Sequence, residues 1–273
     1  MVLIAGFLSG ILASLLGVGG AVLTTPVIRF LGATPIAAVG STVPAILPGA
    51  IAGALRYRKE GYLNERSAVI CGFSGMAFAA VGAWVADVVD ARWLMILTAL
   101  LVTWSGLQLA RSAFLSSHAE AAEDLAANGQ EVVEAAEGRA RGGHSSELDE
   151  DPSVPRLVIL GVSAGFLAGL LGVGGGILLT PGLTMFVKLA PKKAIATSLA
   201  AVAMMSSTAL VTHIALGHVD WTFALPLALG IVPGARVGAR ITIASSDRQV
   251  RLTAGLAFLV IGCGYLMREV ASL

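Results

Sequence analysis

Charged side chains are scarce in this 273-residue chain, and their scarcity excludes most soluble folds. Only 13% of the residues are Asp, Glu, Lys or Arg, whereas a soluble domain carries roughly 25%. Apolar residues make up 56%, the mean hydropathy is +0.84, and the stretch Met1–Ile28 contains no charge. Uncharged apolar runs of about 18 residues or more are typical of membrane-spanning helices. The sequence therefore predicts an all-α polytopic membrane protein that lies in the lipid bilayer of the cell membrane.

Cysteine and the usual catalytic motifs are also rare or missing. Cys71 and Cys263 lie far apart in apolar segments, and no CxxC or Cys/His cluster accompanies them. This spacing excludes the common metal and redox motifs, so no metal and no cofactor are expected. The chain has no continuous basic face and no phosphate-binding glycine loop in a βαβ context. These absences argue against nucleic-acid binding and against an enzyme.

The few charges are distributed unevenly along the chain. Residues 112–155 hold ten acidic side chains against Arg139 and Arg141, and they contain few large apolar residues. Such a segment cannot bury enough apolar surface to fold alone. We therefore interpret 112–155 as an acidic, solvated linker between a first membrane repeat, 1–111, and a second membrane repeat, 156–273.

An internal repeat connects the two apolar parts of the chain. Gly10–Pro26 reads GILASLLGVGGAVLTTP and Gly165–Pro181 reads GFLAGLLGVGGGILLTP, with twelve of seventeen positions identical. With one added residue the match continues, so that the turn Gly61–Asn64 corresponds to Gly217–Asp220. Repeats of this size in a membrane chain are typical of secondary transporters.

Each repeat contains four hydrophobic blocks, of which the first is unusual. The blocks cover 2–31, 34–55, 67–86 and 92–111, and then 156–187, 193–215, 221–243 and 249–267. The last three of each set suit single spans of roughly 20 residues. Glycine-rich strings at 17–20 and 172–176 interrupt the longer first block. Because glycine holds helical geometry poorly, we expect each first block to be broken or re-entrant.

Two topologies remain open, and they depend on how the first block crosses the membrane. A single crossing gives each repeat an even number of spans and makes the repeats parallel. A block that enters and returns gives an odd number and makes the repeats inverted. In the inverted case most loop cations, including Arg58 and Lys192, share one side, as expected for a cytoplasmic face. We therefore favour inverted repeats with the linker in the cytoplasm.

The glycine breaks are the first candidates for substrate binding. A helix that restarts after a break presents unpaired N–H groups and partial positive charge, which suit an anion. Glycine also leaves room for a ligand to approach the backbone. The candidate residues are Gly17, Gly19, Gly20, Gly172, Gly174, Gly175 and Gly176. The alternative is that these glycines only allow close helix packing.

Paired hydroxyl side chains are the second group of candidates. Ser41 and Thr42 lie near the start of the second block, and Thr197 and Ser198 occupy the matching place in the other repeat. Small hydroxyls can donate to an anion without bringing a charge into the membrane. Capping of a helix or hydrogen bonding between helices is the alternative.

Arg236 and His213 are single candidates that the repeat does not duplicate. A cation inside a hydrophobic block is costly and suits an anionic substrate, although Arg236 could instead extend to the membrane interface. His213 is read either as a proton relay or as an interfacial hydrogen-bonding residue. Its counterpart is Tyr57, so the repeat gives no support for a shared role.

Several of these segments together resemble the TauE/SafE sulfite-exporter family. The resemblance rests on the doubled GVGG strings and their flanks, on Ala194–Leu199, on Gly217–Trp221 and on Gly238–Arg240. It covers both repeats and leaves only the linker outside. The resemblance implies passage of small anions, usually sulfite or organosulfonates, along a path near the glycine segments and the Thr-Ser pair. The first repeat departs from the pattern at 41–44, so the two half-sites are expected to differ.

We therefore expect a secondary transporter, or permease, for a small anion that works by alternating access. A gradient of protons or of another ion would supply the energy, since no ATP-binding motif is present. A channel-like anion pathway is one alternative and predicts flux without a coupling ion. A non-transporting membrane scaffold is another, and it would need the acidic linker to bind a specific partner. The sequence does not predict the oligomeric state.

Overall fold

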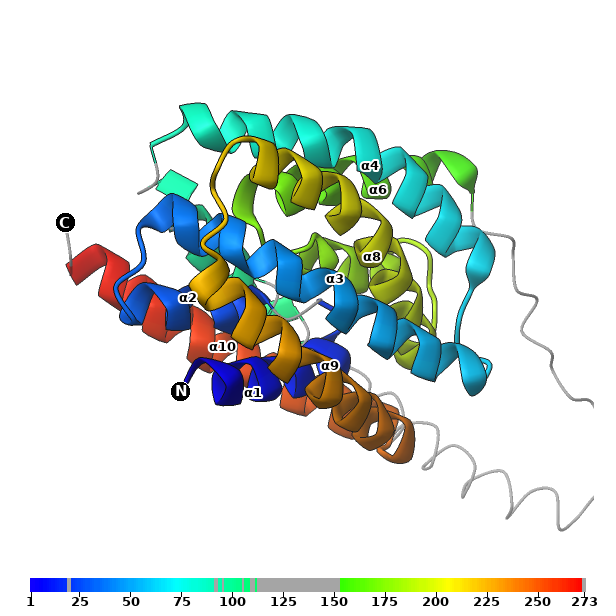
Figure 1. Ribbon diagram of the computed structural model, residues 1–273. Helices are drawn as coiled ribbons and strands as arrows, with labels where there is room; N and C mark the ends of the chain where they lie inside the picture. The colour runs from blue at the N-terminus through cyan, green and yellow to red at the C-terminus, as the bar shows by residue number, and fades with distance from the viewer. Residues whose placement is uncertain are drawn as a thin grey trace, which may run out of the picture.

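A computed structural model describes residues 1–18, 21–90, 93–94, 96–104, 106–108, 111 and 153–271. These residues are helical, with short turns and no strand among them. The helices are α1 (Val2–Leu16), α2 (Ala21–Phe30), α3 (Pro35–Lys59), α4 (Glu65–Val88), α6 (Val154–Leu171), α7 (Gly176–Met185), α8 (Pro191–Ala215), α9 (Trp221–Ala244) and α10 (Asp247–Ala271) (Figure 1). Further helical residues lie within Ile96–Gln108. The acidic segment expected at 112–155 lies almost wholly outside the described residues.

Five helices are long and apolar enough to cross a membrane, namely α3, α4, α6, α8 and α9. Their outer faces carry large apolar side chains, and Phe73, Trp84 and Leu229 are all more than half exposed. Contiguous apolar surface of this kind is rare on soluble monomers but suits contact with lipid tails. The expectation of an all-α polytopic membrane protein is confirmed.

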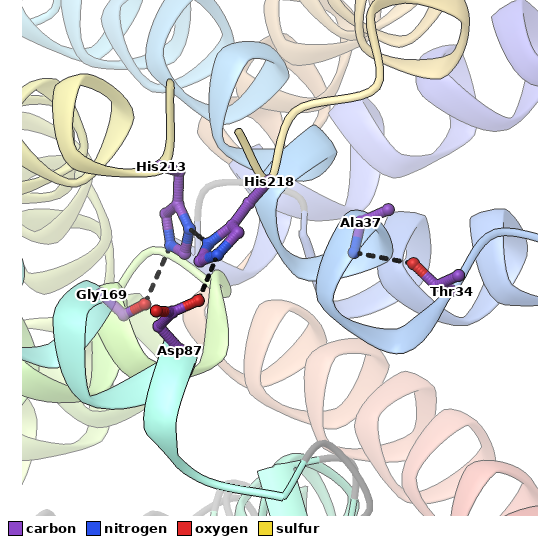
Figure 2. Close-up of polar contacts among 6 residues, drawn as sticks. All are labelled: Thr34, Ala37, Asp87, Gly169, His213 and His218. Atoms are coloured by element: carbon purple, nitrogen blue, oxygen red, sulfur yellow. Dashed lines mark hydrogen bonds and ion pairs between the residues drawn. The ribbon is translucent and has the colours of Figure 1, made fainter. Parts of the chain in front are cut away.

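Polar side chains fix where several helices begin. The Thr34 hydroxyl accepts a hydrogen bond from Ala37 N at the start of α3 (Figure 2). Asn64 accepts from Ser67 N at the start of α4. Asp220 accepts from the backbone N and the hydroxyl of Thr222 at the start of α9, and these bonds hold the pKa of its carboxyl below the ordinary value. Each cap satisfies a backbone donor that the first turn leaves free.

The long first block of each repeat is interrupted at its glycines, as the sequence predicted. Helix α1 ends at Gly17 with φ 72°, and α6 ends at Gly172 with φ 62°. This left-handed backbone costs an L-residue about 1–2 kcal/mol, which explains the glycine at both places. Helices α2 and α7 contain ten residues each. At about 1.5 Å per residue, they are too short to span a hydrocarbon core of about 30 Å.

Two helix pairs, α1 with α9 and α4 with α6, approach to backbone contact. A Cβ added to Gly10 would overlap the backbone of Ile231, and one added to Gly165 would overlap the backbone of Gly75. In both pairs, later residues of one helix contact later residues of the other, so the two helices of each pair run parallel. The glycines that face the partner helix are Gly6, Gly10, Gly230, Gly234 and Gly238 in the first pair and Gly75, Gly82, Gly161, Gly165 and Gly169 in the second. Close approach through small residues is a common way for membrane helices to associate.

Apart from α10, which contacts the others only weakly, the helices with the bounds given above form two groups, and each group takes helices from both repeats. Helices α1, α2, α3 and α9 pack together, and α4, α6, α7 and α8 pack together. The groups meet mainly along α3 and α8. These two helices run antiparallel, because Gly53 in the last part of α3 lies against Leu199 in the first part of α8 (Figure 1).

Basic residues gather at one end of the helices. The end of α9 and the start of α8 lie together there, since Lys192 Nζ donates to Ile243 O at 3.1 Å. The start of α4 is at the same end, because Asn64 N donates to Thr197 Oγ1 at 3.3 Å. The basic residues of this end include Arg56, Arg58, Lys59, Arg66, Arg156, Lys192, Lys193 and Arg240, and Arg56 and Arg58 pair with Glu60 and Glu65 there. The opposite end carries Arg29, Asp87, Asp90 and Asp220.

Candidate functional site at the paired helix breaks

The two glycine breaks meet in the interior, where the two helix groups touch. A Cβ added to Gly176 would overlap the carbonyl oxygen of Gly17, and one added to Gly174 would lie 3.2 Å from Val18 O. Gly17, Val18 and the whole of 172–176 are buried. The predicted glycine candidates of the two repeats are therefore in contact, although Gly19 and Gly20 lie outside the described residues.

One hydroxyl from each predicted pair binds the break of the other repeat. Thr42 Oγ1 donates to Gly172 O at 2.9 Å and lies 2.7 Å from Val39 O. Ser198 Oγ donates to Gly17 O at 2.7 Å. These two reciprocal bonds run between the helix groups, because α3 belongs to one group and α8 to the other. Thr180 Oγ1 adds a third bond of this kind, to Gly17 O at 3.3 Å.

The other member of each pair holds a turn within its own group. Ser41 Oγ accepts from Asp220 N at 2.8 Å, just before α9 begins. Thr197 Oγ1 accepts from Asn64 N at 3.3 Å, just before α4 begins. Ser41 and Thr197 thus make equivalent contacts that position helix starts. These contacts match the hydrogen-bonding alternative that the sequence left open for the pairs.

Tyr57 and His213 close the carbonyl ends of the broken helices. Tyr57 Oη donates to Ser14 O at 2.8 Å near the end of α1, and His213 Nε2 lies 3.1 Å from Gly169 O near the end of α6. The last four carbonyls of a helix lack a partner within it, and inside a membrane they must find one in the protein. The repeat pattern alone did not support a shared role of these residues, but in the structure they make equivalent bonds.

His213 is also the end of a short polar chain that sequence reasoning missed. Its Nδ1 lies 3.1 Å from Nδ1 of His218, and His218 Nε2 lies 2.9 Å from Asp87 Oδ1 (Figure 2). The available signal was the spacing of His213 and His218, which repeats the five-residue spacing of Tyr57 and Tyr62. Nothing in the sequence pattern indicated that Asp87, at the end of another helix, would join them.

Arg236 lies apart from the other candidates. It is on an exposed face of α9, whereas the neighbouring Gly234, Ala235 and Gly238 are buried. The structure therefore does not bring the Arg236 side chain to the breaks. This exposed position matches the alternative of extension toward the interface.

A small pocket lies beside the second break, but its walls are apolar. It is lined by Leu101, Leu167, Leu171, Val173, Gly175, Ile177 and Leu178. Apart from backbone atoms, these residues offer no hydrogen-bond donor to an anion. At the described part of the breaks, the backbones of the two groups touch.

Comparison with known proteins identifies the family. The profile described as Sulfite exporter TauE/SafE matches residues 2–265. The chain belongs to the TauE/SafE sulfite exporter family. Its relatives include the "Probable membrane transporter protein YunE" of Bacillus subtilis, which is 25% identical over 100% of this chain and 98% of that protein. A "Probable membrane transporter protein" of Xylella fastidiosa is 27% identical over 98% and 95% of the two chains, respectively.

A third relative extends the comparison to an archaeon. The "Probable membrane transporter protein MJ0441" of Methanocaldococcus jannaschii is 24% identical over 98% of this chain and 95% of its own length. No solved structure matches the chain. Together with the apolar helices, these matches make this TauE/SafE protein a multi-pass membrane transporter of the cell membrane.

Proposed function

We propose that this TauE/SafE protein is a secondary transporter that moves small anions, such as sulfite or an organosulfonate, by alternating access. It acts as a permease and not as an enzyme. The observation that carries this proposal is the reciprocal pair of bonds from Thr42 to Gly172 O and from Ser198 to Gly17 O. These bonds join the two helix groups at the place where both first blocks are broken.

The chemistry of the interior favours an anion over a metal cation. Within the described residues, the buried oxygen- and nitrogen-bearing side chains are Ser, Thr, His and Tyr57, and no buried carboxylate is present. Calcium and magnesium need carboxylate or carbonyl oxygens arranged around them. Hydroxyl groups and the first backbone amides of α7 are instead hydrogen-bond donors, which a sulfur oxyanion can accept.

The described arrangement is a closed state of the proposed site. Each hydroxyl–carbonyl bond contributes about 0.5–1.5 kcal/mol net, so the three bonds between the groups resist separation only weakly. When the groups move apart, Thr180 and Ser198 lose the carbonyl oxygen of Gly17 and can donate to a substrate. Thr42 loses Gly172 O and keeps only Val39 O, within its own helix. Glycines at 17, 172 and 174–176 allow that substrate to approach the backbone.

The moving units in this proposal are the two helix groups, which differ from the two sequence repeats. The two repeats relate α1 to α6, α3 to α8 and α4 to α9. Under this correspondence, the contact between α1 and α9 in one group matches the contact between α6 and α4 in the other. The antiparallel course of α3 and α8 supports inverted repeats. The basic end would then face the cytoplasm, as positively charged loops usually do.

The test uses purified protein in liposomes on a solid-supported membrane. Rapid steps into sulfite, sulfate, thiosulfate, sulfoacetate, acetate or chloride, with and without a pH gradient, report the current for each anion. We expect a current for a sulfur oxyanion or sulfonate that falls at least tenfold in Ser198→Ala and in Thr42→Val. Ser163→Ala is the control, since the exposed Ser163 hydroxyl bonds only its own helix, at Ile159 O.

Two results would contradict the proposal. Folded wild-type protein that gives no current with any of these anions removes the assigned substrate class. Equal loss of current in Ser163→Ala and Ser198→Ala removes the assigned site.

A further inference from the structure

Three ionisable side chains form a continuous chain from the surface to the core. Asp87 at the end of α4 has a side chain that is 49% exposed, whereas that of His218 is 6% exposed. His213 in α8 is fully buried. The distances between successive ring and carboxyl atoms are 2.9 and 3.1 Å, and His213 Nε2 ends the chain at Gly169 O (Figure 2). Exposure thus decreases stepwise from Asp87 to His213.

The three hydrogen bonds require an additional proton. Gly169 O can only accept, so His213 Nε2 must carry a hydrogen. One hydrogen must lie between the two Nδ1 atoms, and one must lie between His218 Nε2 and Asp87 Oδ1. Two neutral imidazoles and an ionised carboxylate supply only two hydrogens, whereas the three bonds need three. The fully bonded chain therefore holds one extra proton and has no net charge.

The extra proton can reside on Asp87 or on His213, and all three hydrogen bonds are kept in both cases. With the proton on Asp87, the carboxyl donates to His218 Nε2, and His218 Nδ1–H donates to His213. Transfer of the carboxyl proton to His218 Nε2, and of the His218 Nδ1 proton to His213 Nδ1, places the charge on His213. His218 is then neutral and donates from Nε2 to the Asp87 carboxylate. No atom other than hydrogen has to move.

Burial disfavours the charged form of His213, and the C-terminal end of α6 compensates for part of that cost. His213 contacts Gly169 O in the last turn of α6, and the C-terminal end of a helix carries partial negative charge. The first repeat has no such chain, because the matching residues are Tyr57, Tyr62 and Ile243. Tyr57 makes the equivalent carbonyl bond without an imidazole, so proton exchange through this position is specific to the second repeat.

Among the described residues, few charged groups lie near the three ionisable side chains. The α4 helix contributes Asp87, with Asp90 beyond its end. From α3, Gly40 packs against the backbone of His218, and from α6 the contact is Gly169 O. Asp220 at the same end is bonded to Thr222, and Arg29 donates to Ala33 O.

We propose that Asp87, His218 and His213 form a proton-binding relay that couples a proton to anion transport. The proton enters at Asp87, on the end opposite the basic residues, and reaches the break-bearing end of α6 through the two imidazoles. Its role in coupling rests on the proposed function, but its proton binding does not. Protonation of His213 changes the charge beside α6 within four residues of Gly172, where Thr42 joins the helix groups.

The first experiment measures the relay without any transported anion. Histidine is labelled with ¹⁵N in full-length protein carrying His118→Gln and His144→Gln, so that only the two relay imidazoles are observed in lipid. We expect both imidazoles to titrate as a coupled pair, and we expect Asp87→Asn to shift that titration by at least one pH unit. Asp220→Asn, which removes another carboxyl at the same end, is the control and leaves it in place. If the two imidazoles titrate independently, and if their titration is the same in Asp87→Asn as in the wild type, the relay is overturned.

The second experiment separates a proton relay from a structural cap. In liposomes we expect a pH gradient to accelerate anion flux in the wild type, and we expect Asp87→Asn and His213→Tyr to lose at least nine-tenths of that acceleration. His213→Tyr supplies a hydrogen bond to a carbonyl like the one that Tyr57 makes in the first repeat. If His213 had only a structural role, this variant would keep the acceleration by the pH gradient. Full acceleration in folded His213→Tyr would therefore contradict the coupling. Absence of any flux in the wild type would reject the proposed function, while the imidazole titration still decides the relay.

Discussion

Gly17 stabilises the centre of the fold through its left-handed backbone and through its carbonyl oxygen. It ends α1 in the left-handed region, and its carbonyl oxygen accepts from both Ser198 and Thr180. A Cβ built on it would lie 2.6 Å from Thr180 Oγ1 and 3.0 Å from the Ile195 backbone. Conformation and crowding therefore both require glycine here.

We expect Gly17→Ala to destabilise the folded protein by more than the conformational cost alone. The left-handed backbone costs about 1–2 kcal/mol, and overlap with Thr180 and Ile195 adds to it. Thermal unfolding in detergent measures the effect. Gly61→Ala is the control, because Gly61 has a similar φ of 76° but nothing within 4 Å of its Cβ position. An equal loss of stability in the two variants would show that crowding at Gly17 has no effect.

The candidate residues also show what a sequence can and cannot predict about a site. Matched spacing in the repeat made Ser41, Thr42, Thr197 and Ser198 candidates beside the glycine strings. Thr42 and Ser198 bond the breaks, whereas Ser41 and Thr197 bond the turns before α9 and α4. The spacing could not show that the hydroxyls bind carbonyls across the two repeats. It also indicated no partner for His213, because the contact with Gly169 O depends on how α6 and α8 pack. The bond from His218 to Asp87 likewise depends on where α4 ends.

Among the helices, the parallel pairs α1–α9 and α4–α6 have the most extensive contacts of the described fold. Their glycines repeat every four residues over several turns, as in Gly230, Gly234 and Gly238. In lipid no hydrophobic effect drives helices together, so close packing must hold these pairs. The stability of each helix group therefore depends on the absence of side chains along these stripes.

We expect Gly10→Leu to separate α1 from α9 and to lower the yield of folded protein. The new side chain would overlap the backbone of Ile231, which cannot move independently of α9. Overpacking of a tight contact typically costs about 1–3 kcal/mol. Size-exclusion profiles and melting temperatures measure the loss. Gly264→Leu is the control, since nothing lies within 4 Å of its Cβ position, and a similar loss there would contradict this account.

The positions of the helices were largely predictable, but their grouping was not. Hydropathy located the spans at 34–55, 67–86, 193–215 and 221–243 to within a few residues of α3, α4, α8 and α9. The glycine strings also predicted the breaks at Gly17 and Gly172. The packing of α9 against α1 is decided by tertiary structure. The sequence pattern does not predict it, because another glycine-striped helix could have packed against α1 instead. Arg236 illustrates the same limit, since position in a block does not show which way a side chain faces.

At the scale of the whole molecule, the charge distribution predicts how the transporter is oriented in the membrane. Basic residues lie at the end that contains the turn from α3 to α4, and Asp87, Asp90 and Asp220 lie at the other. Positive charge is retained in the cytoplasm during insertion. Asp87, the entry of the proposed relay, would then face the outside of the cell.

Cysteine labelling in intact cells tests this orientation. In a Cys263→Ser background, we expect Asp90→Cys to react with a membrane-impermeant maleimide added outside, and we expect Glu60→Cys to react only after the membrane is permeabilised. Glu60 and Asp90 are both exposed, so accessibility does not distinguish them. The reverse pattern would place the basic end outside and contradict the proposed entry of protons.

The exchange of helices between the two groups has a consequence for the origin of the molecule. Because α1 packs on α9 and α6 packs on α4, a single repeat leaves both of its glycine-striped surfaces uncovered. Two identical chains inserted in opposite directions would cover these surfaces, because the first helix of each chain would pack against the other chain. A gene encoding one repeat could therefore have produced a working antiparallel homodimer before duplication and fusion. The present protein is more easily derived from such a dual-topology ancestor than from the joining of two self-sufficient domains.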